Sequence, residues 1–180
     1  GTVVAYAIGP FIVRLAFGLR RPRHPIPGRD LAGVVVAVGN HVTDVQPGDE
    51  VFGWCSGAFA EYACTSESNL LPKPTNLTLE QSAAVGDSAF TALAAVRDQG
   101  KVQQGQRILI NGASGGVGTA LLQLGRLAEL EMYGTCSSRG AATVSELGGV
   151  PIDYKSQDYV KEIYRLTSEG VDAVFDPIGG

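Results

Sequence analysis

The sequence has few cysteines and no extended block of basic residues. Its three cysteines, Cys55, Cys64 and Cys136, are widely separated among 180 residues. An odd, scattered set is typical of reduced thiols in a cytosolic protein and does not suit a disulfide scaffold. The net charge is −4. This charge, with no basic block to offset it, argues against a nucleic-acid partner.

Long apolar runs are also lacking. The longest one near the start, "PFIVRLAFGL" at residues 10–19, is interrupted by Arg14. It is far shorter than the roughly 20 apolar residues that span a bilayer, and no signal-peptide cleavage pattern accompanies it. We therefore expect a soluble cytoplasmic protein with no membrane partner.

The sequence contains two regions with different residue patterns. Between about residues 27 and 71, the runs "LAGVVVAVG", "VQPGDEVFG" and "GAFAEYACT" are each interpreted as strand separated by turns. Near Thr78 the pattern changes, because Thr78 and Gln81 form a capping box that predicts a helix up to about Gly100, with a possible break at Gly86. The predicted domains are residues 1–78 and 79–180.

After Gly105, strands and helices alternate. Strands are predicted at residues 107–111, 131–137, 151–154 and 171–176, and helices at 116–130, 141–149 and 156–170. In the first helix, Leu121, Leu124 and Leu127 form the expected apolar stripe. Such alternation predicts βαβ units with a parallel sheet, an α/β Rossmann domain of which the first four strands are present. The sequence stops directly after a strand that a helix should cover, so we expect an internal fragment of a longer protein.

The glycine-rich stretch "NGASGGVG", residues 111–118, lies between the first of these strands and its helix. Aligned to the dinucleotide fingerprint, Ala113, Gly115 and Gly118 take the three glycine positions. The alternative is a purely structural turn, and the strand–loop–helix context favours a dinucleotide site. The expected phosphate-binding residues at this helix N-terminus are Ser114, Gly115, Gly116 and Val117.

The end of the second strand, "GTCSSRG", selects the cofactor. No carboxylate for an unmodified ribose lies between Gly134 and Gly140. Instead Ser137 and Ser138 offer hydroxyls, and Arg139 offers a guanidinium suited to a 2′-phosphate. The alternative for Arg139 is an exposed residue at a helix start. The pattern predicts NADPH in preference to NADH.

At this point the stretch "GQRILINGASGGVGTALLQLGR", residues 105–126, resembles the quinone oxidoreductase/zeta-crystallin branch of the medium-chain dehydrogenase/reductase superfamily. "PGRDLAGVVVAVG", "VQPGDEVFG" and "GAFAEYA" are similar to that family's GroES-like domain. The resemblance implies a GroES-like β-barrel domain before the Rossmann domain, both incomplete here, and possible homodimers of the full-length protein. It also implies that Thr91 packs near the nicotinamide, and the alternative for Thr91 is an ordinary helix residue. Tyr154, at the end of the third strand, is expected near the adenosine end.

Zinc is not expected. The Gly-His-Glu segment of zinc-dependent alcohol dehydrogenases corresponds here to Gly28-Arg29-Asp30, which lacks the histidine and the glutamate. His24 and His41 are interpreted as solvent-facing. We interpret Asp30 as making local backbone hydrogen bonds.

The resemblance implies a zinc-independent reductase that transfers hydride from NADPH to a quinone or an α,β-unsaturated carbonyl. Tyr62 is a candidate proton donor, but a buried strand tyrosine is favoured, and no catalytic acid is assigned. An alcohol dehydrogenase-like activity and a non-catalytic NADPH-binding protein remain as alternatives.

Two departures from the family pattern are noted. Glu129 occupies a helix C-terminal position where the family has glycine, at a cost on the order of 1 kcal/mol. Pro151 opens a strand, which is tolerated at an edge.

Overall fold

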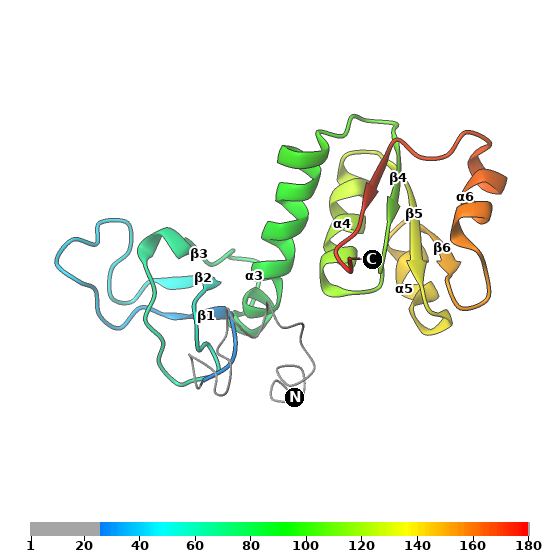
Figure 1. Ribbon diagram of the computed structural model, residues 1–180. Coiled ribbons are helices and arrows are strands. Elements are labelled where there is room, and N and C mark those ends of the chain that lie inside the picture. Colours follow the sequence, from blue (N-terminus) through cyan, green and yellow to red (C-terminus); the bar gives the residue numbers. More distant parts are fainter. Residues whose placement is uncertain (1–25, 180) are drawn as a thin grey trace. The chain divides into compact units, whose positions relative to one another are not determined.

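Two units make up the structure, a computed structural model that describes residues 26–179 (Figure 1). The first unit ends at Asp87 and the second begins at Ser88. His24 lies outside the described residues.

The first unit contains a three-stranded antiparallel sheet in the order β1-β2-β3. Strand β1 (Asp30–Val34) pairs with β2 (Glu50–Trp54), which pairs in turn with β3 (Leu70–Pro72) after the short 3₁₀ helix η1 (Glu67–Asn69). The turn before β2 is the Pro-Gly-Asp turn expected from the sequence, with Gly48 at φ 99°. The first strand is shorter than "LAGVVVAVG" suggested, because the regular ladder ends at Val34.

The prediction of a strand at residues 57–65 is wrong. This segment is irregular, and its backbone donors bond outside any ladder: the N–H of Gly57 and that of Ala58 each donate to the Gly28 carbonyl, and the N–H of Phe59 donates to the Pro27 carbonyl. Gly57 adopts φ 83°, which turns the chain away from an extended path. Tyr62 is consequently 75% exposed, which contradicts the buried strand tyrosine favoured above.

Helix α3 (Leu79–Leu93) begins with the predicted capping box. The Thr78 N–H donates to Gln81 Oε1 at 3.0 Å, and the Gln81 N–H donates to Thr78 Oγ1 at 3.2 Å. The helix continues through Gly86 without a break and is followed by a π-helix, η2 (Ala94–Gly100), that ends at Lys101 with φ 46°. The expected span is therefore confirmed and the possible break is not present.

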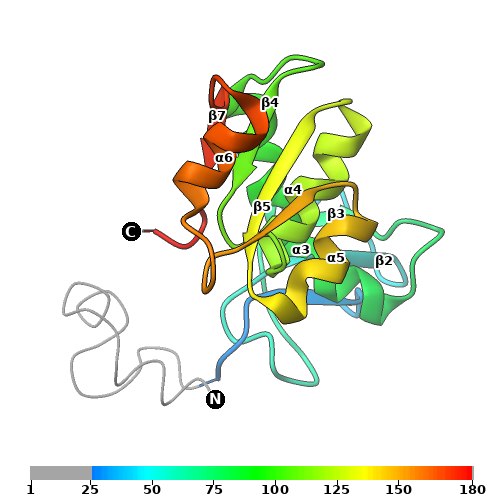
Figure 2. The ribbon, with the colours of Figure 1, turned by 90° about the vertical axis from the view of Figure 1, so that its right-hand side faces the viewer.

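The second unit has a four-stranded parallel sheet in the order β6-β5-β4-β7. Its strands are β4 (Arg107–Ile110), β5 (Glu131–Cys136), β6 (Val150–Asp153) and β7 (Ala173–Phe175). The helices are α4 (Gly116–Leu127), α5 (Ala141–Glu146), which follows the 3₁₀ helix η3 (Ser138–Gly140), and α6 (Tyr159–Thr167). Figure 2 shows α5 following β5 and α6 following β6 along the chain. This parallel sheet confirms the predicted α/β Rossmann domain.

The sheet has a hydrophobic core on each face, as is typical of parallel sheets. Alternate strand residues separate the two cores: Ile108 and Ile110 pack with Leu121 and Leu122 of α4, and Leu109 packs with Ile163 of α6. Helices α4 and α6 lie on opposite sides of the strands (Figure 1).

The prediction that Leu127 belongs to the apolar stripe of α4 is wrong. Leu127 is 82% exposed, whereas Leu122 is fully buried. The reason is helical phase: the buried residues of α4 are Gly118, Leu121, Leu122 and Gly125. At about 100° per residue, Leu127 lies on the opposite side of the helix from them. The next residues turn back toward β5. Leu130, just after this turn, is buried instead.

Both unusual positions are explained by the structure. Glu129 follows the α4 C-cap with φ 53°, the left-handed conformation for which glycine is favoured. Pro151 lies in β6, which is an edge strand of the sheet.

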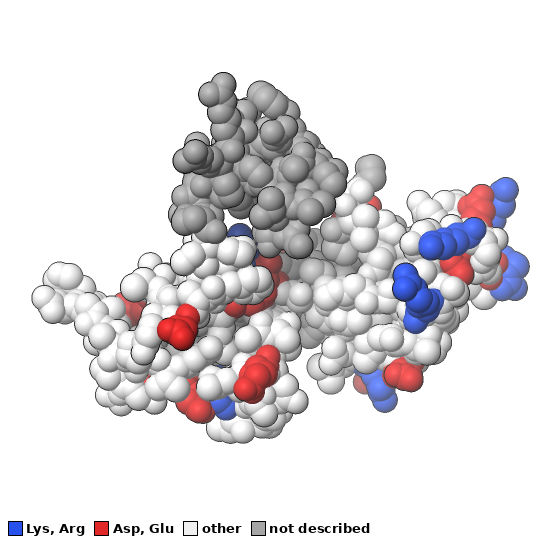
Figure 3. All heavy atoms as spheres, turned by 90° about the horizontal axis from the view of Figure 1, so that it is seen from below, with Lys and Arg blue, Asp and Glu red and all other residues white. Residues whose placement is uncertain are grey.

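Charge on the second unit is mixed. On the face shown in Figure 3, its Lys and Arg side chains stand among Asp and Glu. On α6, Arg165 pairs with Glu162 at 2.5 Å and Lys161 pairs with Asp158 at 3.4 Å. Among residues 26–179, no helix is both long and apolar enough to cross a membrane.

Candidate functional site

The glycine loop joins the carboxyl end of β4 to the N-terminus of α4. Gly112 adopts φ 70°, and α4 begins at Gly116 with Gly115 as its N-cap. A Cβ on Gly118 would lie 2.4 Å from the Gly112 carbonyl oxygen and 2.6 Å from Ala113 Cα. Only glycine allows this first turn to pack directly on the loop, which is the role expected for the third glycine of the fingerprint.

The same loop packs closely on the second strand of the sheet. Ala113 is fully buried, and a Cβ on Gly134 of β5 would lie 2.4 Å from the Ala113 Cβ. A larger residue at either position would therefore push the loop away from β5. The first-turn N–H groups of α4, which have no acceptor within the helix, remain directed along its axis at this edge of the sheet.

Ser114 brings the glycine loop together with the turn after β5. Its side chain lies against Gly140, where an added Cβ would be 2.5 Å from the Ser114 Oγ. Ser137 is the extended residue before η3, and Ser138 and Arg139 are exposed within it. The loop and the "CSSR" segment, distant in sequence, thus form one surface.

Arg139 is available to an anion on this surface. Within the part of the chain that is described, its guanidinium makes no ion pair or hydrogen bond with the protein. Some other exposed arginines of the second unit are paired, for example Arg165 with Glu162. A free guanidinium next to two hydroxyl side chains is suited to bidentate binding of a phosphate.

Among residues 26–179, no side-chain hydrogen bond or ion pair joins Thr91 or Tyr154 to this surface. Thr91 is exposed on α3, and Tyr154 is 54% exposed directly after β6. The Tyr154 N–H donates to the Cys136 carbonyl at 3.2 Å, which fixes its backbone at the carboxyl edge. Their proposed contacts with a cofactor stay predictions.

A hydrogen-bond chain across the carboxyl edge was not anticipated from the sequence. Thr135 Oγ1 accepts from the Gly112 N–H at 2.9 Å and donates to Asn111 Oδ1 at 2.6 Å. Asn111 Nδ2 donates to Asp176 Oδ1 at 2.8 Å. The Asp176 carboxylate also accepts from the N–H groups of Ile178 and Gly179. These bonds connect the ends of β4, β5 and β7.

The Asp176 carboxylate is held ionised by this arrangement. The Asn111 amide and, next, the Gly179 N–H hold the pKa of Asp176 below its ordinary value. The sequence signal for this network is positional: each of the three side chains lies at or just after the end of a parallel strand, where such ends meet.

One further polar side chain faces the start of α4. A Cβ on Gly116 would lie 2.8 Å from the Oγ of Ser88, a partly buried residue of α3 within the second unit. Ser88 precedes Thr91 by three residues, so both lie on one side of the helix. This side chain was not singled out in the sequence.

Other candidate groups serve structural roles. Cys136 is buried, and burial, with the Asp153 charge second, raises the pKa of its thiol, so it is a poor nucleophile. Asp30 accepts a hydrogen bond from the Asp87 N–H at 2.5 Å. The expected bond to the backbone is therefore present, but its donor is distant in sequence and not local. His41 is exposed in a turn, as expected.

The side chains of the Gly-Arg-Asp segment have partners within the first unit. The Arg29 guanidinium lies 5.3 Å from the centre of the Trp54 ring and 3.7 Å from the Asp87 carboxylate. Across residues 26–179, no three His, Cys, Asp or Glu side chains cluster in a way that could hold a metal ion.

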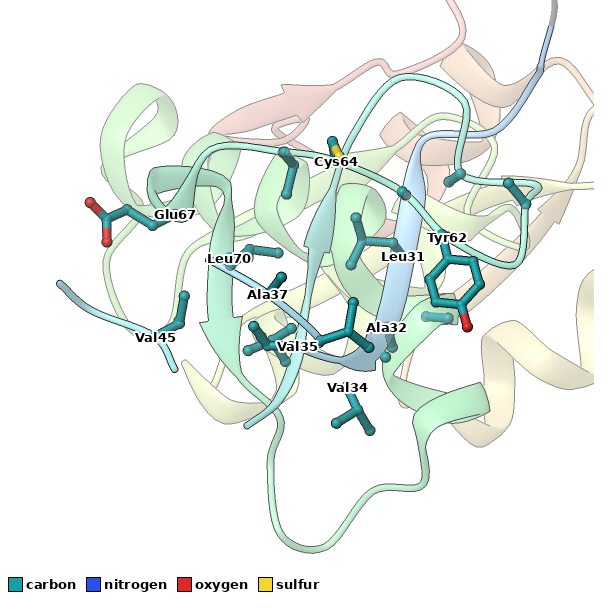
Figure 4. Close-up of a pocket in the computed structure, with 18 of the residues that line it drawn as sticks. Leu31, Ala32, Val34, Val35, Ala37, Val45, Tyr62, Cys64, Glu67 and Leu70 are labelled. Atoms are coloured by element: carbon teal, nitrogen blue, oxygen red, sulfur yellow. The ribbon is translucent and has the colours of Figure 1, made fainter. Parts of the chain in front are cut away.

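The first unit also contains a pocket of about 1200 Å³ (Figure 4). Its lining is mostly apolar, with Leu31, Val34 and Val35 on one part and Tyr62 and Cys64 on another. Val34 is 51% exposed. The pocket therefore has the character of a partly open β-domain interior.

Comparisons with known proteins agree with both units. The alcohol dehydrogenase GroES-like domain family matches residues 7–75. The synaptic vesicle membrane protein VAT-1 homolog of Rattus norvegicus is 39% identical over 165 residues, covering 89% of this chain and 41% of that protein. The quinone oxidoreductase of Sus scrofa is 36% identical over 155 residues, covering 83% of this chain and 47% of that protein. The chain spans about half the length of these curated relatives, or less.

Solved structures give the same result. A quinone oxidoreductase from Pseudomonas syringae pv. tomato superposes with a TM-score of 0.84 at 33% identity, covering 96% of this chain and 55% of that chain. A mycobacterial protein complexed with NADPH superposes with a TM-score of 0.79 at 28% identity, covering 85% of this chain and 50% of that one. The GroES-like and Rossmann architecture expected from the sequence is confirmed.

Proposed function

The chain belongs to the medium-chain dehydrogenase/reductase superfamily, and on that premise we propose that it is part of an NADPH-dependent, zinc-independent reductase. The proposed acceptor is a quinone or an α,β-unsaturated carbonyl. The observation that carries the proposal is the joining of the glycine loop to the "CSSR" turn through Ser114 and Gly140.

The glycine cradle supports a dinucleotide. The Cβ positions of Gly116 and Gly118 are already occupied by neighbouring atoms, so neither residue can carry a side chain over the N–H groups at the start of α4. Ser114, Gly115, Gly116 and Val117 would hold the pyrophosphate. Asn111, through Thr135 and Asp176, keeps this loop fixed to the strand ends.

The turn after β5 supports NADPH in preference to NADH. Ser137, Ser138 and Arg139 would hold the 2′-phosphate, with Tyr154 beside the adenosine and Thr91 beside the nicotinamide. When bound, NADPH supplies the hydride. Hydroxyl and guanidinium donors at this turn favour a phosphate, and no carboxylate is present there to bind an unmodified ribose.

Zinc-independence is proposed from the donor set. A catalytic zinc needs three Cys, His or carboxylate ligands. At the segment that corresponds to the ligand-bearing one, Arg29 stacks on Trp54 and Asp30 is bonded to the backbone of α3. Both side chains are therefore already used within the first unit.

Arg139 provides the direct test of cofactor choice. Arg139→Ala is expected to weaken NADPH binding about tenfold, since a charged hydrogen bond contributes about 1.5–3 kcal/mol and the site is partly solvated. NADH binding should change less than about twofold. Arg126→Ala is the matched control, because Arg126 is also exposed but lies in the last turn of α4, away from the loop.

Fluorescence titrations of the wild type, Arg139→Ala and Arg126→Ala with NADPH and with NADH give the dissociation constants. An Arg139→Ala variant that keeps the wild-type preference would contradict the assignment of the 2′-phosphate site. NADPH consumption with a panel of quinones, enones and simple alcohols then tests the reaction. Turnover of alcohols alone would favour the alcohol dehydrogenase alternative, and binding without turnover would favour a non-catalytic NADPH-binding protein.

A further inference from the structure

Ser88 lies where α3 passes the N-terminus of α4. Its Oγ is 2.8 Å from the position that a Cβ on Gly116 would take, and its Cβ is 3.8 Å from that position. The hydroxyl is therefore in contact with the first residue of α4, and both residues belong to the second unit.

The Ser88 hydroxyl is not used by the protein itself. Over residues 26–179 it has no hydrogen-bond partner, although it is only partly exposed. Serines in helices commonly bond to the carbonyl four residues earlier, as the side chain of Thr167 does with Ile163. A hydroxyl that forgoes that bond and faces a helix N-terminus is free to donate to an anion there.

The environment determines which group it would meet. The N–H groups of the first turn of α4 lack acceptors within the helix, and the helix dipole adds positive potential at the same place. Ser114 and Arg139 lie toward Gly140, on the β5 side of the loop. Ser88 approaches Gly116 from α3, so the loop has hydroxyl donors from two separate elements.

We propose that Ser88 is a cofactor-binding residue that donates a hydrogen bond to the pyrophosphate at the start of α4. The proposal rests on the NADPH site described above and adds to it a donor from outside the glycine loop. It also explains why residue 116 has no side chain, because a methyl group there would collide with the Ser88 hydroxyl.

The test uses two ligands that share the adenosine end. NADPH contains the pyrophosphate, and adenosine 2′,5′-bisphosphate contains the 2′-phosphate without it. Ser88→Ala should raise the Kd for NADPH about tenfold, as expected for one lost hydrogen bond to a charged group. The Kd for the bisphosphate should change less than about twofold. Arg139→Ala, as a comparison, should weaken both ligands.

The outcomes separate the alternatives. An unchanged Kd for NADPH in Ser88→Ala overturns this inference while leaving the NADPH site intact. An equal loss for both ligands also overturns it, because a general disturbance of the fold would affect both. Absence of NADPH binding by the wild-type chain would overturn the proposed function itself. Alanine is a good helix former, so the unliganded variant should melt at the wild-type temperature.

Discussion

Gly118→Ala introduces a single methyl group at the most crowded glycine of the candidate site. In the structure that methyl carbon would lie 2.4 Å from the Gly112 carbonyl oxygen, 2.6 Å from Ala113 Cα and 2.7 Å from the Ala113 carbonyl carbon. All three are backbone atoms of the loop. No side chain can rotate to make room, so α4 or the loop must move.

The expected cost follows from two opposing effects. Overpacking of this kind costs about 1–3 kcal/mol, and contacts with rigid backbone place it near the upper limit. Alanine recovers about 0.8–1 kcal/mol of helix propensity relative to glycine. The net destabilisation is about 2 kcal/mol. For a unit of about 90 residues, this lowers the melting temperature by roughly 8–16 °C.

Gly125→Ala in the same helix is the matched control. Its methyl group would meet the Met132 Sδ at 2.4 Å, while Ile108 Cδ1 is at an ordinary 3.7 Å. A methionine side chain is flexible and can move aside, so with the gain in helix propensity this variant should stay within about 1 kcal/mol of the wild type.

Differential scanning calorimetry measures both variants, and a titration with NADPH follows. Gly118→Ala should lose stability and cofactor affinity together. The reasoning would be refuted if Gly118→Ala melted within about 2 °C of the wild type, or if its melting temperature fell no further than that of Gly125→Ala.

Two further predictions concern stability. Glu129→Gly should stabilise the chain by somewhat less than about 1 kcal/mol, because it relieves the left-handed conformation at φ 53° but loses the hydrogen bond from Gln104 Nε2 to the Glu129 carboxylate; a lower melting temperature would contradict this. Burial and, second, the hydrogen bond to Glu131 raise the pKa of Tyr133 to about 12. Because the unfolded chain releases this proton near pH 10 and the folded chain near pH 12, stability should be full below pH 10 and fall by roughly 2–3 kcal/mol toward pH 12. Tyr133→Phe should reduce that decline in alkaline melts, and an unchanged decline would count against it.

Much of the second unit could be predicted from local sequence signals. Each of the four strands lies within about two residues of its predicted bounds. In the first unit, the capping box at Thr78 located the start of α3 directly. Gly118 was assigned from spacing alone, and its backbone contacts agree with that assignment. Pro151 was expected at an edge and lies in an edge strand. These features depend on neighbours in sequence, so the sequence carries them.

The errors have a common physical origin in tertiary contacts. The segment at residues 57–65 has a strand-like pattern, yet its donors bond to Pro27 and Gly28. Leu127 was placed by its spacing from Leu124, whereas the sheet decides which face of α4 is buried, and Leu127 lies on the other face. The bond from Asn111 to Asp176 joins residues 65 positions apart, and the approach of Ser88 to Gly116 depends on how two helices pack. The Ser88 contact leaves no local signature, and the Asn111–Asp176 bond leaves only the placement of both residues at strand ends.

The most direct test of the central claim is a titration of the chain with NADPH and with NADH under identical conditions. The arrangement of the glycine loop and Arg139 predicts saturable binding of both, with NADPH about tenfold tighter. Equal affinity for the two cofactors, or no saturable binding of NADPH, would contradict it.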